Sequence, residues 1–262
     1  MSDIPISSHF FTNRGGNTLM KEFEGILENN PQVKNLDAVV GFLRASGYFA
    51  LRPFLDGINK VRILIGIDVD KYIARAHQKG MLFMGAEEEV KEECLQLLKK
   101  DIEQSHYNKK VEDGMLQMLQ DMIDGKLELR AHPSKRIHAK FYILYPDNFN
   151  QHTFGAAITG SSNLSGNGLG IGDDKQYEFN VKLTQYEDVA FARHEFELLW
   201  DEAKNVAIDA EDFKATLDDT YVKEDVSPYE LYIKMLMEYF SDRVLAIDND
   251  DPFDMPDGYS KL

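Results

Sequence analysis

The sequence predicts an α/β fold followed by a small C-terminal helical segment. Near the N-terminus, amphipathic helical patterns alternate with short apolar runs that are typical of buried strands. From Leu127 onward, short β-like runs alternate with loops rich in Gly, Asn, Ser and Asp. At 262 residues and 43% hydrophobic content, the chain is long enough to close one sizeable core around such a sheet.

The first elements alternate between helix and strand. Residues 17–28 place apolar side chains at helical spacing, and residues 38–42 then form a continuous apolar run. Residues 48–58 form a helical pattern that leads to a second strand over residues 61–66. We therefore expect two neighbouring strands joined by a helix.

Two long amphipathic helices are expected next, over residues 87–100 and 110–124. Cys94 is the only cysteine, so no disulfide framework is expected, and its place in the helical pattern of the first predicts that it fills the core. A methionine stripe lies on the second, and we expect it to fill the core: Met115, Met118 and Met122.

The second half of the domain is expected to be mainly β-structure that ends in a helix. Four strands are predicted, at residues 127–130, 137–144, 154–159 and 177–183. Thr184 and Glu187 resemble a capping box at the start of the closing helix. We expect this α/β domain to span residues 1–205.

The remaining residues divide into a helical extension and a linker. Within residues 206–242, Ser227, Pro228 and Glu230 combine an N-cap, a first-turn proline and a capping glutamate. Residues 243–262 are acidic, interrupted by Pro and Gly, and without periodicity, which is typical of a linker. The ending favours a fragment of a longer protein, with a natural C-terminal tail as the alternative.

The charge distribution limits where nucleic acid can bind. A net charge of −16 counts against a surface that attracts phosphate everywhere, because phosphate binding needs clustered Lys and Arg. One segment is cationic and is predicted to be a nucleic-acid-binding patch: Lys126, Arg130, Lys135 and Arg136. No run of about eighteen apolar residues and no signal-peptide pattern is present, so we expect a cytoplasmic protein without a membrane partner.

Three polar clusters carry the chemistry. His138 and Lys140 are two residues apart on one strand and so project from the same sheet face; the alternative is a buried structural histidine beside a lysine. Ser161 and Asn163 follow the next strand in a small polar turn, which can donate hydrogen bonds to an anion. Glu178 begins a third strand and is a candidate to orient a histidine ring.

No metal and no cofactor is expected. The other candidate ligands, His132, His152 and His194, lack the mutual spacing and acidic partners of a metal site, and we interpret them as surface or packing residues.

The order H-x-K, then G-S-x-N, then an acidic residue resembles the signature of the phospholipase D superfamily, over about residues 36–200. The resemblance implies a mixed sheet sandwiched by helices and a metal-independent site formed by two H-x-K motifs. It implies that His138 is the nucleophile and forms a phosphohistidine, while Lys140, Asn163 and Ser161 hold the phosphate oxygens. Because the chain carries one motif, the resemblance also implies a homodimer in which a second His138 protonates the leaving oxygen.

Two features depart from the family pattern. The aspartate expected five residues after Lys140 is replaced by Tyr145, with Asp147 two residues further along. The connection over residues 146–153 is longer than usual, which a surface hairpin loop tolerates. The replacement by Tyr145 favours the alternative of a non-catalytic module with the same fold.

A narrower resemblance concerns residues 37–42, 46–49 and 61–66. Similar segments occur in phospholipase D-like domains fused ahead of bacterial superfamily-two DNA helicases and in related restriction nucleases. In the helicase fusions, a segment like residues 227–232 precedes the motor. The chain contains no G-x-x-x-x-G-K-[ST] phosphate loop, so an ATPase would reside in a downstream domain.

These observations predict a metal-independent phosphodiesterase that acts on DNA, with RNA as the other possible substrate, as the dimeric N-terminal module of a helicase or restriction system. The first alternative is a non-catalytic DNA-binding or dimerisation module with the same fold. The second, a phospholipid hydrolase, is disfavoured because no amphipathic basic helix or membrane-facing apolar stretch is present.

Overall fold

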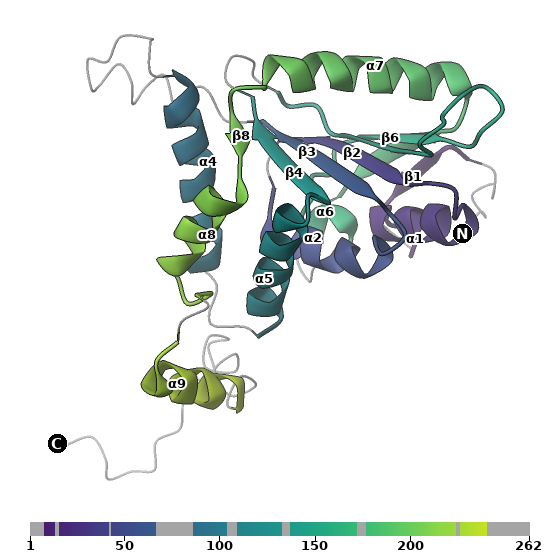
Figure 1. Cartoon of the computed structure of the whole chain (residues 1–262). Coiled ribbons are helices and arrows are strands. Elements are labelled where there is room, and N and C mark those ends of the chain that lie inside the picture. The colour runs from purple at the N-terminus through teal and green to yellow at the C-terminus, as the bar shows by residue number, and fades with distance from the viewer. Residues whose placement is uncertain are drawn as a thin grey trace.

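A mixed β-sheet with helices on both faces forms the body of the protein (Figure 1). The computed structural model describes residues 8–13, 16–41, 43–66, 86–103, 109–132, 137–171, 177–223 and 226–239. Its strands are β1 (Phe10–Thr12), β2 (Asn35–Val40), β3 (Lys60–Ile65), β4 (Leu127–Ala131), β5 (Phe141–Tyr145), β6 (Ala156–Gly160), β7 (Phe179–Leu183) and β8 (Ala207–Ile208). Together they form one sheet in the order β1-β7-β6-β5-β2-β3-β4-β8.

Helix α7 (Tyr186–Glu202) covers one face of the sheet, and α1, α2 and α5 lie on the other (Figure 1). The helices besides α7 are α1 (Leu19–Asn29), α2 (Ala45–Leu51), α4 (Ala86–Glu103), α5 (Lys109–Ile123), α6 (Gly166–Leu169), α8 (Ala210–Asp218) and α9 (Pro228–Tyr239), with a short 3₁₀ turn, η1, at Arg52–Phe54. This arrangement confirms the predicted fold class, a mixed α/β sheet between helices.

The sheet topology brings several chain segments to one end of the sheet. Strands β2, β3 and β4 are parallel, whereas β5 pairs antiparallel with both β2 and β6. The register places Val39 opposite Phe141, and Phe141 opposite Thr159. Gly160 in turn lies opposite Asn180. The ends of β2 and β6 therefore meet the beginnings of β5 and β7, and the loops at these points are neighbours.

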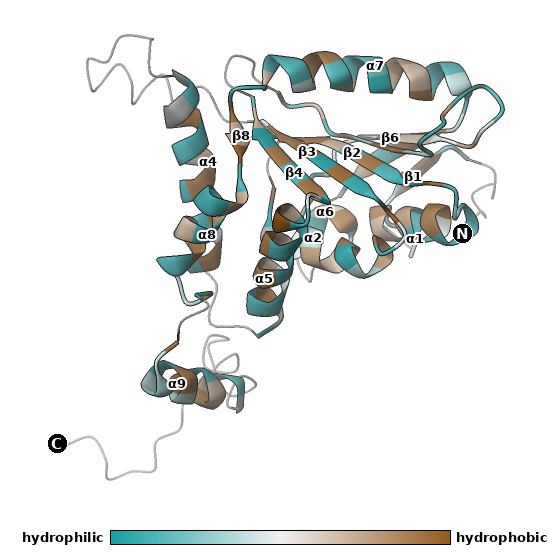
Figure 2. Ribbon diagram, viewed as in Figure 1, coloured by the Kyte–Doolittle hydropathy of each residue, from teal (hydrophilic) through white to brown (hydrophobic). Residues whose placement is uncertain are grey.

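Two apolar cores stabilise the sheet, one on each face. Side chains of β4 alternate between buried and partly exposed, and Figure 2 shows the matching alternation of apolar and polar residues. Cys94, Met115 and Met118 are at most 2% exposed and Met122 is 9% exposed, which confirms the prediction that these residues fill the core. In the described part of the chain, no helix is both long and apolar enough to cross a bilayer.

Most predicted elements agree with the structure, but β5 begins at Phe141 and not at residue 137. Its neighbour β2 ends at Val40, so the residues before Phe141 lack a full set of ladder partners. Strands β1 and β8 and helix α6 were not expected. They have only three, two and four residues, which is too short for a recognisable period.

The two predicted capping boxes have different outcomes. Ser227 and Glu230 exchange both bonds, with Ser227 N–H donating to Glu230 at 2.8 Å and Glu230 N–H donating to Ser227 Oγ at 3.2 Å. The box at Thr184 and Glu187 is wrong, because α7 has Gln185 as its N-cap and makes no side-chain cap bond. Glu187 is consequently one position too early to reach back to the cap.

The sheet continues beyond the expected domain boundary at residue 205. Strand β8 pairs antiparallel with β4 through Leu129 and Ile208. Helix α9 is joined to α5 by a buried ion pair between Lys234 and Glu112. The division into a domain, a helical extension and a linker stays a prediction, and residues 243–262 lie outside the described residues.

Candidate active site

An open pocket of about 650 Å³ lies at the end of the sheet where β5 and β7 begin and β6 ends. Five predicted site residues line it: His138, Lys140, Ser161, Asn163 and Glu178. The remaining lining residues come from the starts of α2 and α6 and from the segment before β7: Arg44, Ser46, Ser165, Gly166, Asn167, Gly168 and Tyr177. The topology thus brings together the residues of all three sequence clusters.

His138 and Lys140 lie just before β5 and contact each other. Lys140 Nζ donates to the His138 carbonyl oxygen at 2.9 Å and lies 3.2 Å from Nδ1 and 3.1 Å from Nε2 of the ring. Because the two ring distances are nearly equal, the ammonium lies along neither nitrogen lone pair. His138 is exposed and Lys140 is only 5% exposed, so the alternative of a buried structural histidine is wrong.

The environment of Lys140 tunes its charge. Burial lowers the pKa of Lys140 below its usual value of 10.5, because removal of water disfavours the ammonium form. The negative charge of Glu178 acts in the opposite direction and raises that pKa. A buried cation at the base of an open pocket attracts an anion that enters from solvent.

The amide of Asn163 is oriented by the backbone after β2. Gly41 N–H donates to Asn163 Oδ1 at 2.9 Å, so the opposite end of the amide is the Nδ2 donor. A Cβ at Gly41 would lie 3.2 Å from that oxygen and 3.6 Å from Lys140 Nζ. The loop after β2 therefore packs against both side chains and holds the amide beside the ammonium, so two groups that carry hydrogen-bond donors lie side by side at the pocket.

Ser161 and Glu178 form a second pair. The Ser161 hydroxyl donates to the Glu178 carboxylate and accepts the Phe179 N–H at 3.1 Å. Glu178 is 8% exposed, and its own N–H donates to Asn13 Oδ1 at 3.1 Å. The hydrogen bonds of the described residues thus connect Glu178 to Ser161 and not to the ring of His138, and the role of Glu178 in orienting that ring stays a prediction.

Gly160 permits the close approach of the end of β6 to the start of β7. A Cβ at Gly160 would lie 2.3 Å from both Asn180 Oδ1 and the Phe179 carbonyl oxygen. No larger residue fits without movement of β7, which explains why a glycine precedes Ser161.

The two described residues of the predicted cationic patch, Lys126 and Arg130, do not line the pocket. Lys126 Nζ donates to the Leu55 carbonyl at 2.6 Å. Arg130 donates to the Trp200 carbonyl at 2.7 Å and lies 4.1 Å from the centroid of its ring. Burial lowers the pKa of both cations. Lys135 and Arg136 lie outside the described residues, so the role of the patch in nucleic-acid binding stays a prediction.

The pocket instead contains a cation and an aromatic ring that sequence reasoning missed, Arg44 and Tyr177. Arg44 is the N-cap of α2, four residues after β2, and Tyr177 directly precedes Glu178. Their positions next to strand ends could have predicted that they lie at the pocket, because loops at one end of an α/β sheet converge.

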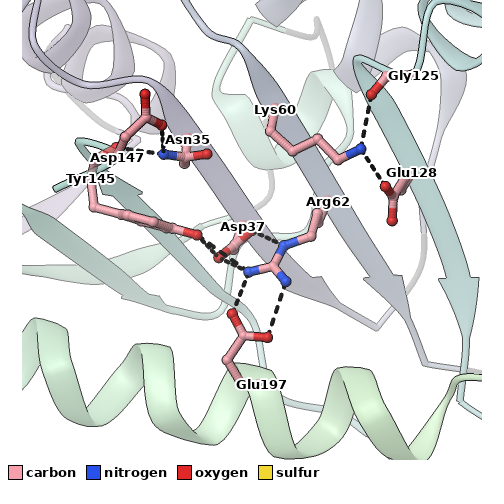
Figure 3. A network of polar contacts seen from close by, with 9 residues as sticks. All are labelled: Asn35, Asp37, Lys60, Arg62, Gly125, Glu128, Tyr145, Asp147 and Glu197. Atoms are coloured by element: carbon pink, nitrogen blue, oxygen red, sulfur yellow. Dashed lines mark hydrogen bonds and ion pairs between the residues drawn. The ribbon is translucent and has the colours of Figure 1, made fainter. Parts of the chain in front are cut away.

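Tyr145, which replaces the aspartate of the family pattern, lies at the opposite end of β5. Tyr145 is five residues further along the chain than Lys140, a distance of about 17 Å in an extended strand. Its hydroxyl donates to Asp37 Oδ2 at 2.7 Å, and Arg62 donates to both oxygens of that carboxylate at 2.7 Å (Figure 3). Glu197 from α7 completes the network by accepting from Arg62 at 2.6 and 3.1 Å.

The network lies between the sheet and α7, with Asp37 and Tyr145 buried and Glu197 partly exposed. Burial raises the pKa of Asp37, while Arg62 and Tyr145 oppose the shift. Burial and the Asp37 charge raise the pKa of Tyr145 to about 12, so its hydroxyl stays a proton donor at neutral pH. Asp147 accepts from Asn35 Nδ2 at 2.8 Å (Figure 3). Tyr145 therefore supports the fold and has no contact with the pocket.

The three other histidines considered as metal ligands lie outside the pocket lining. His132 is fully buried, with Nε2 at 3.2 Å from Glu202 Oε2. His152 and His194 are exposed, which agrees with the interpretation of this group as surface or packing residues.

Comparisons with known proteins return similar folds at low identity. No protein-family model and no curated protein matches the chain. Similar solved structures include Nuc, a phospholipase D family member from Salmonella typhimurium, at 12% identity and a TM-score of 0.39, covering 74% of this chain and 93% of Nuc. Phosphatidylserine synthase from Haemophilus influenzae Rd KW20 has 13% identity and a TM-score of 0.44, covering 90% of this chain and 45% of that chain. TrmBL2, an archaeal chromatin protein with a novel mode of DNA binding, has 13% identity and a TM-score of 0.36, covering 78% of this chain and 56% of TrmBL2.

Proposed function

We propose that the chain is a phospholipase D-like, metal-independent phosphodiesterase that acts on the backbone of DNA. One observation carries the proposal: an exposed histidine and a buried lysine of one segment line one polar pocket together with an oriented amide from another. A nucleophile beside two phosphate-oxygen donors is the arrangement that displacement at phosphorus requires.

The reaction proceeds in two displacements. A ring nitrogen of His138 attacks phosphorus, a P–N bond forms, and the P–O bond to one ester oxygen breaks. Lys140 and Asn163 stabilise the negative charge on the non-bridging oxygens. Water then attacks the phosphohistidine, the P–N bond breaks, and the phosphomonoester end leaves with His138 restored.

The leaving oxygen needs a proton, and the proposed acid is a second His138. Among the described residues that line the pocket, His138 is the one histidine. A twofold homodimer would place a second copy opposite the first, where it donates to the leaving oxygen and then takes a proton from the attacking water. Sedimentation at micromolar concentration is expected to give twice the 30.0 kDa of the chain; a monomer alone would contradict the shared site.

The lining favours a polynucleotide over a phospholipid. The described lining residues carry polar or charged side chains, apart from two glycines and the amphipathic ring of Tyr177, and include no aliphatic side chain. Acyl chains bind to apolar walls, whereas phosphate and sugar groups bind to hydrogen-bond donors. RNA offers the same phosphodiester and is the other polynucleotide to test.

The proposal is tested by incubating the protein with plasmid and single-stranded DNA in EDTA. Wild-type cleavage that disappears in His138→Ala supports it, and an acid-labile, alkali-stable phosphate adduct on the protein identifies the intermediate. Lys204→Ala is the control, since Lys204 is exposed on the turn after α7 and does not line the pocket. Cleavage that survives in His138→Ala would contradict the assigned nucleophile.

A non-catalytic DNA-binding or dimerisation module is the second candidate. It is favoured by the Ser161 hydroxyl, which donates to Glu178 and therefore does not point its proton at a phosphate. Salt-sensitive DNA binding without cleavage, weakened in Lys140→Ala, would support this candidate over the enzyme.

We further propose that the chain works as the N-terminal module of a helicase or restriction system. The proposal is supported by residues 227–232, which begin a helix with a capping box and resemble the segment that precedes the motor in the helicase fusions. Protein isolated from its source cells is then expected to carry DNA-dependent ATPase activity in the same polypeptide or a stable complex. Active phosphodiesterase that never accompanies an ATPase would contradict the association with a helicase.

A further inference from the structure

We infer that the pocket accepts a single-stranded segment of nucleic acid, in which Tyr177 stacks on a base and Arg44 binds the phosphate next to the scissile one. The inference rests on the proposed function and adds the form of its substrate. It assigns roles to two lining residues that the reaction itself does not use.

Tyr177 provides an aromatic face in a polar pocket. Its side chain is 56% exposed, and it stands directly before Glu178, whose carboxylate is part of the site. A half-exposed ring contributes little to the fold core, but it offers a surface on which any base can stack. Stacking on such a ring typically changes affinity by about 5- to 150-fold per base.

The neighbouring strands continue this aromatic surface. Phe10 of β1 and Phe179 of β7 stack with their centroids 5.4 Å apart and are 55% and 49% exposed. Phe179 follows Glu178 directly in the chain. A nucleic-acid strand that leaves the pocket along β7 would therefore meet two further rings.

Arg44 provides a second cation. Its backbone N–H donates to the Leu164 carbonyl at 3.0 Å, which ties the start of α2 to the loop that carries Asn163. Gly47 makes this approach possible, because a Cβ there would lie 2.4 Å from the Leu164 backbone. Lys140 and Asn163 suffice for one phosphate, whereas a polynucleotide carries a charge at every nucleotide. A second, exposed cation in the same pocket matches the adjacent phosphate.

The stacking role requires an unpaired strand. A base within a duplex is stacked on both sides and cannot offer its face to Tyr177, whereas a base of a single strand can turn outward. A volume of about 650 Å³ lies well within the range of pockets that bind whole small molecules, so it has room for a nucleotide and not only for its phosphate.

The test compares three fluorescein-labelled probes by anisotropy: a thymidine 12-mer, the same strand with tetrahydrofuran abasic residues, and a 12-base-pair duplex. The wild type is expected to bind the thymidine strand most tightly. Tyr177→Ala should weaken that binding by about 5- to 150-fold, leave abasic binding unchanged, and be rescued by Tyr177→Phe. Tyr232→Ala is the matched control, because Tyr232 is 57% exposed on α9 and outside the pocket.

Arg44→Ala is expected to weaken binding of the thymidine and abasic strands alike. It should also lower the slope of log affinity against log salt by about 0.7, the value for one phosphate contact on a single strand. Lys204→Ala removes an exposed cation elsewhere and should leave the slope unchanged. Equal slopes for wild type and Arg44→Ala would overturn the role of Arg44.

The inference and the proposed function fail in different ways. Equal affinity of wild type and Tyr177→Ala for the thymidine strand would overturn the stacking role, as would equal cleavage of all three probes. Equal cleavage of all three probes would still support the proposed phosphodiesterase activity. Tyr177-dependent binding without cleavage would support the single-strand site and contradict the phosphodiesterase function. Absence of both binding and cleavage would contradict both proposals. A Tyr177→Ala variant that loses dimerisation and not base preference would make the ring part of an interface and overturn the inference.

Discussion

Replacing Tyr145 by Phe should lower stability and leave turnover intact. The hydroxyl of Tyr145 donates to the buried carboxylate of Asp37 at 2.7 Å, and Arg62 donates to the same hydroxyl at 3.3 Å. The Phe variant keeps the ring, which lies 4.0 Å from the Arg193 guanidinium carbon and contacts Phe149 edge-on. The change therefore removes hydrogen bonds without opening a cavity.

The magnitude follows from the charge of the acceptor. A hydrogen bond to a charged group contributes about 1.5–3 kcal/mol net, and this is the loss expected for Tyr145→Phe. Tyr145→Asp, which introduces the aspartate of the resembled pattern, should cost more, because it removes a buried ring, at about 3–5 kcal/mol, and adds a carboxylate beside Asp37. Lys140 lies about 17 Å away along β5, so neither change reaches the reacting phosphate.

Urea unfolding measures the stability of each variant. Turnover is measured as hydrolysis of a DNA strand per folded molecule, at urea concentrations well below the unfolding transition. The Phe variant should show a lower midpoint with an unchanged slope. Activity that is lost in Tyr145→Phe at full stability, or gained in Tyr145→Asp, would refute the assignment of Tyr145 to the fold.

Three further changes test other parts of the structure. Gly47→Ala places a Cβ 2.4 Å from the Leu164 backbone, so calorimetry should show a lower melting temperature than for the wild type. Burial lowers the pKa of Lys140, so activity should fall at a pH below 10.5 as the ammonium deprotonates, and Lys140→Arg should move that limb of the pH profile upward. The hydrogen bond from Lys223, with those of the capping box, lowers the pKa of Glu230 to about 2. Its stabilisation is present above the usual pKa of 4.5 and is lost as pH falls toward 2, so the stability difference between wild type and Glu230→Gln should shrink over that range.

The central strands and five of the residues that line the pocket could be predicted from the sequence because both follow short-range patterns. His138 and Lys140 stand two apart, and Ser161 and Asn163 follow an apolar run that ends in Gly160. Residues at the ends of adjacent strands meet whenever those strands pair, so pattern and topology lead to the same pocket.

The residues that were missed depend on contacts between distant segments. Arg44 enters the pocket because its loop bonds to Leu164, 120 residues further along the chain. Conversely, Lys126 and Arg130 form a linear cationic cluster, but Leu55 and Trp200 supply carbonyls that hold them away from the pocket. Charge clustering along a strand does not say which surface each side chain faces.

The completeness of the site can be tested by mixing chains. His138 is exposed, Lys140 contacts its ring from within the same chain, and the described pocket lining contains no second histidine. The described lining therefore holds the proposed nucleophile without the proposed acid. If a second His138 supplies the acid, a dimer of one wild-type and one His138→Ala chain is inactive. Co-expression in equal amounts should then leave about one quarter of the activity of the same total of wild-type protein, since one quarter of randomly formed dimers carry both histidines. A chain that works alone would retain about one half, and that result would refute the shared site while leaving the fold and the phosphate donors unchanged.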